Sequence, residues 1–218
     1  MIEIIPALLV HDQQTFELRL KQVSPFTKVV QVDVTDGSFV KNHTWFNTVN
    51  LIEEDFDIKY WLHLMIGDPL EYITNFPKVE IRHIKGITAH IETLNEDTLD
   101  TFVDLVQSLG VEVGVAGNVN FNDIKLALKQ YNLDEVLVMG VNPGHSAEPV
   151  LDDTVDRIKS ANLQARVIAV DGGVNETNID KFIKEGATRF YLSSYIFNNE
   201  NLLPILILKK KDSLNKKK

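Results

Sequence analysis

The chain has 218 residues, 44% of them hydrophobic and 24% charged, which suits one single-core globular domain or two small ones. Its formal net charge of −9 argues against nucleic-acid binding. The absence of cysteine excludes disulfides and thiolate metal sites and fits a cytoplasmic location. No segment approaches the roughly 20 apolar residues of a membrane span, and the N-terminus lacks the pattern of a signal peptide, so we expect no membrane association.

Short apolar runs alternate with helical patterns along the chain. Most of these runs are continuously apolar, which is typical of parallel strands covered on both faces. The predicted strands are residues 3–9, 28–34, 58–64, 86–90, 111–116, 135–139, 166–170 and 188–192. The predicted helices are residues 12–23, 48–55, 69–75, 95–109, 121–130, 149–160, 177–185 and 199–209.

Capping residues agree with several of these helices. Asp68-Pro69 opens the third, Asn120 and Asn175 can cap the fifth and seventh, and Gly110 and Gly186 can each end a helix. Residues 209–218 form a basic tail, which we expect to be a solvated, disordered end; nucleic-acid or membrane contact is the less favoured interpretation.

Eight strand–helix units indicate a single (β/α)₈ TIM barrel over residues 1–208. The alternative is a doubly wound open sheet. That fold usually carries a glycine-rich turn after its first strand, and the first strand here runs into Pro6-Ala7-Leu8-Leu9 without a glycine.

Asp171-Gly172-Gly173 follows an apolar strand, an arrangement that suits a site for a phosphorylated ligand as well as a plain turn. Gln31 and Asp33 are two residues apart on the second strand, so both side chains point into the barrel, and His63 lies near the end of the third. Two carboxylates inside a barrel need protonation, a cation or a metal to offset their desolvation.

These residues resemble the ribulose-phosphate 3-epimerase family. The family motifs are apolar strand–Pro-Ser, His-x-Asp-x-Met-Asp-x-x-Phe-Val, His-Leu-Met, Val-Asn-Pro-Gly, Val-Asp-Gly-Gly and Gly-Ser-x-Ile-Phe. The corresponding segments occur in the same order and spacing: Ile5-Pro6-Ala7, residues 31–40, His63-Leu64-Met65, Val141-Asn142-Pro143-Gly144, Val170-Asp171-Gly172-Gly173 and Ser193-Ser194-Tyr195-Ile196-Phe197.

The resemblance implies interconversion of D-ribulose 5-phosphate and D-xylulose 5-phosphate through an enediolate, with Asp33 and Asp171 as acid/bases on opposite faces of the sugar carbon. It also implies a divalent metal (zinc, iron, manganese or cobalt) and a homo-oligomer. Asp33, His63 and Asp171 match three of the four metal ligands. The implied substrate and phosphate contacts are His63, Met65, Gly144, Gly172, Gly173, Ser193 and Ser194.

The chain departs from the family pattern at several of these positions. Gln31 replaces the first histidine ligand, so we expect weak or absent metal binding. Ala7, Thr35 and Ser193 replace a serine, a methionine and a glycine, and residues 144–148 replace Gly-Phe-Gly-Gly-Gln with a sequence that ends in Glu148.

Three functional hypotheses follow: the pentulose-phosphate epimerase, an epimerase of another phosphorylated ketose such as a hexulose 6-phosphate, and a non-catalytic barrel that binds a sugar phosphate. His90 with Glu92 resembles the family's His-x-Glu, and it could line the pocket or be structural.

Overall fold

The protein is seen in a computed structural model that describes residues 2–45, 57–118, 121, 131–145, 147–162 and 165–198, apart from the side chains of 78–80. The predicted helices 48–55 and 199–209, residues 122–130 of the fifth predicted helix with its cap Asn120, and the basic tail lie outside these residues.

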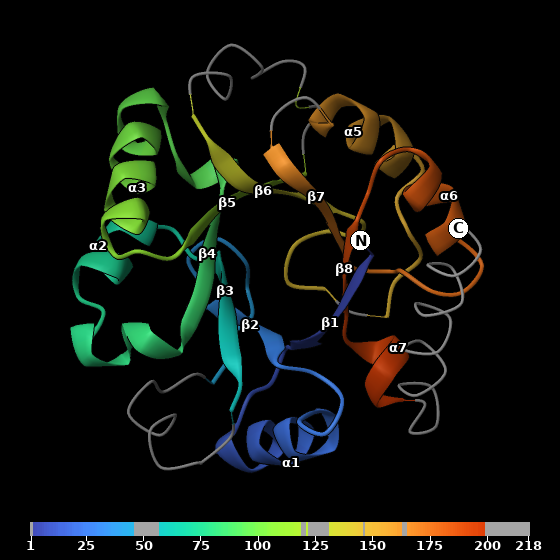
Figure 1. Cartoon of the computed structure of the whole chain (residues 1–218), viewed down its shortest axis with the longest axis horizontal. Coiled ribbons are helices and arrows are strands. Elements are labelled where there is room, and N and C mark those ends of the chain that lie inside the picture. The colour runs from blue at the N-terminus through green and yellow to red at the C-terminus, as the bar shows by residue number, and fades with distance from the viewer. Residues whose placement is uncertain are drawn as a thin grey trace.

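Eight parallel strands form a closed barrel in chain order (Figure 1). Because β1 pairs with β8 as well as with β2, the sheet has no free edge, and the (β/α)₈ prediction is confirmed over the open-sheet alternative. The strands are β1 (Glu3–Leu8), β2 (Val29–Thr35), β3 (Lys59–Met65), β4 (Ile84–His90), β5 (Glu112–Gly117), β6 (Leu133–Met139), β7 (Ala165–Asp171) and β8 (Arg189–Leu192).

Helices lie outside the ring of strands (Figure 1). They are α1 (Gln13–Val23), α2 (Pro69–Thr74), α3 (Glu96–Ser108), α5 (Thr154–Ala161), α6 (Ile179–Lys184) and α7 (Ser194–Phe197), with short 3₁₀ segments η2 (Lys78–His83) and η3 (Ile91–Thr93). Asp68 caps α2 as predicted, because its carboxylate accepts from the Glu71 N–H at 2.8 Å. No helix in the described part of the chain is long and apolar enough to cross a membrane.

Two helices begin later than the sequence predicts. α5 begins at Thr154 because the preceding residues are tied to the barrel, with the Leu151 N–H donating to the Gly140 carbonyl at 2.8 Å. α6 begins at Ile179, so the prediction of Asn175 as its cap is wrong. The Asn175 side chain instead accepts from the Thr177 N–H at 2.9 Å and forms a turn before the helix.

Alternate strand residues build two separate cores. On β2, Val30, Val32 and Val34 belong to the larger core between barrel and helices, whereas Gln31 and Asp33 point into the barrel. A smaller core fills the interior of the barrel: Ile5, Ala7, Trp61, Ala116, Leu137, Met139, Ala169 and Tyr191.

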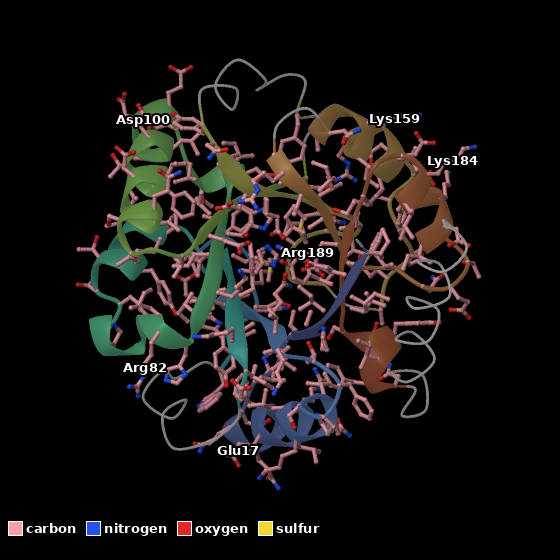
Figure 2. All side chains as sticks on the ribbon, viewed as in Figure 1. Glu17, Arg82, Asp100, Lys159, Lys184 and Arg189 are labelled. Carbon is pink, nitrogen blue, oxygen red and sulfur yellow. The ribbon has the colours of Figure 1, made fainter. Side chains whose placement is uncertain are left out.

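A buried ion pair fills the N-terminal end of the barrel. Arg189, which Figure 2 labels near the centre of the ring, donates from Nη1 to the Glu135 carboxylate at 2.8 Å, and the Tyr191 hydroxyl donates to it at 2.7 Å. Burial raises the pKa of Glu135, although the charge of Arg189 opposes this. This network fills the N-terminal end of the barrel. An open site is therefore expected at the C-terminal end, where the strands end.

Candidate active site

Two carboxylates and one imidazole meet near the C-terminal end of the barrel. Asp33 on β2 is paired in register with His63 on β3, so both side chains point to the same side of the sheet. Asp171 ends β7. The Nδ1 atom of His63 lies 3.0 Å from Asp33 Oδ1 and 3.4 Å from Asp171 Oδ2. The structure therefore brings together three residues that are separated in the sequence.

The side-chain amide of Gln31 donates hydrogen bonds to both carboxylates. Its Nε2 donates to Asp33 Oδ1 at 2.9 Å and to Asp171 Oδ2 at 2.6 Å. Its Oε1 is buried and has no hydrogen-bond partner among the described residues. The amide thus presents its nitrogen, and not its oxygen, to the carboxylates.

Burial and the repulsion between the two carboxylates disfavour negative charge in this cluster. Desolvation raises the pKa of Asp33, the nearby Asp171 raises it further, and hydrogen bonds from His63 and Gln31 oppose both effects. Desolvation alone would lower the pKa of His63, but its hydrogen bonds to Asp171 and Asp33 outweigh this and raise it to about 9. In the metal-free cluster this shift favours the imidazolium form of His63, whose positive charge offsets part of the negative charge.

A second imidazole, that of His90, contacts His63. His63 Nε2 lies 2.9 Å from His90 Nε2, and His90 Nδ1 lies 3.3 Å from Glu92 Oε2. Glu92 is held in turn by the Asn118 N–H at 2.7 Å. Burial and the charge of His63 lower the pKa of His90, although Glu92 opposes them. A neutral His90 can therefore accept a hydrogen bond from His63 at Nε2 and donate one from Nδ1 to Glu92.

The position of His90 bears on its two interpretations. It has no exposed surface, does not line the pocket and contacts His63, which favours a structural role in supporting that side chain. Sequence reasoning missed the His63–His90 contact. The placement of both residues near the C-terminal ends of adjacent strands was the available signal.

The three ionisable side chains at the centre could hold a metal ion. One ligand atom each from Asp33, His63 and Asp171 lies within 4.8 Å of the others, and two carboxylates with an imidazole suit a divalent cation. The unpaired Gln31 Oε1 atom is the candidate for a fourth metal ligand. If the amide turned over, this oxygen would point at the cluster, where a bound cation would attract it. Without a cation, the two carboxylates favour the observed orientation, in which the amide N–H groups point at them.

A pocket opens directly above the carboxylates. Both carboxylates line it, together with the loops that follow β6, β7 and β8. The other predicted contacts that line it are Met65, Gly144, Gly172, Gly173, Ser193 and Ser194. Gly172 and Gly173, at the end of β7, have φ angles of 92° and 67°, a left-handed conformation that favours glycine. Gln31 and His63 have no exposed surface and lie outside the lining.

The loop after β6 is anchored by a residue that sequence reasoning left without a role. The Asn42 side-chain amide donates to the Gly144 carbonyl, across 102 positions of the chain, and no local pattern signals this contact. Ala147 has a φ of 60°, unusual for a residue other than glycine, and His145 Nδ1 lies 2.7 Å from Glu148 Oε1.

Two of the other departures lie away from the pocket. Ala7 is fully buried in the inner core and pairs in register with Gln31. Thr35 is held by its backbone N–H, which donates to the Thr44 hydroxyl at 2.9 Å. Neither residue lines the pocket, whereas Ser193 does.

Comparisons with known proteins identify the family of this chain. The model of the ribulose-phosphate 3 epimerase family matches residues 3–197. Ribulose-phosphate 3-epimerase of Bacillus subtilis is 28% identical over 210 residues, covering 92% of this chain and 94% of that protein. The enzyme of that name from Aquifex aeolicus is 29% identical, covering 80% of this chain and 79% of that protein.

Solved structures support the fold alone. The tryptophan synthase α-subunit of Pyrococcus furiosus is 14% identical with a TM-score of 0.68, covering 94% of this chain and 96% of that chain. Since the family match spans nearly all of the described barrel, the chain belongs to the ribulose-phosphate 3-epimerase family.

Proposed function

We propose that this protein is an isomerase that interconverts D-ribulose 5-phosphate and D-xylulose 5-phosphate through an enediolate. Family membership supports the reaction type. The observation that carries the proposal is the pair of carboxylates, Asp33 and Asp171, that share one buried cluster and both face the pocket. Inversion through a planar intermediate needs a proton acceptor on one face and a proton donor on the other, and two carboxylates supply both.

The surrounding residues suit this role. Burial and the nearby Asp171 raise the pKa of Asp33, which suits a carboxyl group that exchanges a proton with carbon. In the metal-free protein, Gln31 and the His63 imidazolium donate hydrogen bonds to these carboxylates and hold them beneath the pocket. In that state the positive charge of His63 also favours the negative charge that develops on an enediolate.

A divalent metal would be held by Asp33, Asp171 and a His63 that has given up its extra proton, with Gln31 Oε1 available only after its amide turns over. When bound, such an ion acts as a Lewis acid that stabilises the enediolate oxygens. Zinc, iron, manganese and cobalt are the candidates. Because an amide oxygen is a weaker ligand than imidazole for these ions, we expect low occupancy in the purified protein.

We propose that the substrate phosphate lies over the ends of β7 and β8. Gly172, Gly173, Ser193 and Ser194 line this part of the pocket, and the left-handed glycines allow close approach of an anion to backbone N–H groups. Gly144 lines the facing loop, and Met65 supplies apolar contact near Asp33.

The test is an epimerisation assay with D-ribulose 5-phosphate beside elemental analysis of the same preparation. Asp171→Asn should lose activity by about 10²-fold or more, because an amide has the shape of the carboxylate but exchanges no proton. Far-ultraviolet circular dichroism should show an unchanged fold. Turnover by Asp171→Asn at the wild-type rate would contradict the acid/base assignment.

The altered loop after β6 favours a second candidate, an epimerase of another phosphorylated ketose such as a hexulose 6-phosphate. Two residues of this loop, His145 and Ala147, line the pocket, and Glu148 contacts His145. These side chains differ from those of the family's Gly-Phe-Gly-Gly-Gln loop. A substrate panel separates the two epimerases. A protein that binds sugar phosphates without turning over any member of the panel would support the non-catalytic alternative.

Assembly and location complete the proposal. We propose a homo-oligomer located in the cytoplasm; the absence of cysteine supports a reducing compartment. Light scattering of the purified protein tests the first statement, and imaging of the tagged protein in cells tests the second.

A further inference from the structure

The described residues that line the pocket include a single basic side chain. Asp33 and Asp171 bring two carboxylates to one end of it, and the lining contains no lysine or arginine; its basic member is His145, on the loop after β6. A phosphate dianion in this pocket therefore faces acidic groups on its inner side. Backbone N–H groups contribute only partial charges, so a nearby cation would matter strongly for holding the anion.

His145 is held in a defined position at the mouth of the pocket. Its own N–H donates to the Asn142 carbonyl at 3.1 Å. The preceding Gly144 accepts from Asn42, which ties this loop to the chain beyond β2. The left-handed Ala147, with φ of 60°, lies just before Glu148, whose carboxylate contacts the imidazole. The loop thus keeps an unusual backbone conformation next to this contact.

Glu148 determines which nitrogen of His145 is free. The carboxylate lies 2.7 Å from Nδ1, and because a carboxylate only accepts, Nδ1–H donates a hydrogen bond to Glu148. Nε2 remains for a ligand. The side chains of His145 and Glu148 are 55% and 40% exposed, so a substrate can reach them. An imidazole that donates to Glu148 through Nδ1 leaves Nε2 directed elsewhere, and an N–H at Nε2 would donate a charge-assisted hydrogen bond to an anion.

Gly173 lies close to the same loop. A β-carbon added at Gly173 would lie 3.2 Å from the Glu148 carbonyl oxygen and 2.6 Å from Val150 Cγ2. The loop that carries His145 is therefore packed against the turn after β7 to which we assign the phosphate, and His145 shares the pocket with that turn.

From this arrangement we infer that His145, oriented by Glu148, is the cationic contact for the substrate phosphate and selects phosphorylated over unphosphorylated ketoses. The inference rests on the proposed function, because it assigns a phosphate to this pocket. The two carboxylates remain the groups that move protons, and His145 acts on binding.

The first experiment measures binding without turnover. Inorganic phosphate is titrated calorimetrically into wild type, His145→Gln and His145→Lys. A charge-assisted hydrogen bond is worth roughly tenfold or more in affinity, so His145→Gln should bind phosphate at least about tenfold more weakly, and His145→Lys should recover most of the loss. His83→Gln is the matched control, because His83 ends η2, ahead of β4, and does not line the pocket.

The second experiment measures selectivity. In His145→Gln, KM for D-ribulose 5-phosphate should rise about tenfold with kcat nearly unchanged, while kcat/KM for unphosphorylated D-ribulose should stay the same. A purely structural role would instead reduce turnover of both sugars.

The outcomes separate this inference from the proposed function. Equal phosphate affinity of wild type and His145→Gln would overturn the inference, as would a His145→Lys variant no better than His145→Gln. Weakened phosphate binding in His145→Gln, together with no epimerisation by wild type, would support the inference and contradict the proposed activity. Wild type without saturable phosphate binding would overturn both the inference and the phosphate site.

Discussion

The buried His63 imidazolium makes stability depend on pH in the metal-free protein. Its pKa in the folded protein is about 9 against an ordinary value of 6.5, and this difference corresponds to about 3 kcal/mol of stabilisation. Because the folded state binds this proton more tightly than the unfolded state, the stabilisation is complete below pH 6.5. It is lost as the pH rises toward 9.

The assay is urea denaturation in the presence of a chelator at several pH values between 6.5 and 9. We expect the free energy of unfolding of wild type to fall by about 3 kcal/mol across this window. His63→Gln, which keeps an amide donor but cannot titrate, should show a much shallower slope. If both proteins lose stability equally over the window, then Asp33 and Asp171 do not hold a proton on His63.

Three further predictions concern glycines and Gln31. Gly173→Val should raise KM for the phosphorylated sugar, because Gly173 has a φ of 67° and its β-carbon would lie 2.6 Å from Val150 Cγ2. The control is Gly110→Val, at a φ of 74° with open space around it. Equal KM in both variants would count against the phosphate placement. Gly140→Ala should lower the free energy of unfolding by about 1–3 kcal/mol, because its β-carbon would lie 2.2 Å from the Gly172 carbonyl oxygen; an unchanged melting temperature would disprove the contact. Gln31→His should raise metal occupancy in elemental analysis, since it adds an imidazole at an inward position of β2, and no gain would show that position 31 is not a ligand site.

The sequence alone determined the architecture and the composition of the centre. Continuous apolar runs separated by amphipathic segments are compatible with strands buried on both faces, and eight such units close into a barrel. The two-residue period of a strand placed Gln31 and Asp33 on the inner side of β2, where both are buried. Asp171 was predicted to belong to the centre because it lies at the end of an apolar run.

Only the tertiary structure decided how these side chains meet. Strand register and barrel closure bring Gln31 within 2.6 Å of Asp171, which lies 140 positions away, and no local pattern encodes that distance. The same closure directs the Gln31 nitrogen to both carboxylates, seats His90 behind His63 and lets Asn42 hold the loop of His145. Local periodicity specifies which face a side chain occupies. Its hydrogen-bond partner depends on the neighbouring strand, which the fold alone supplies.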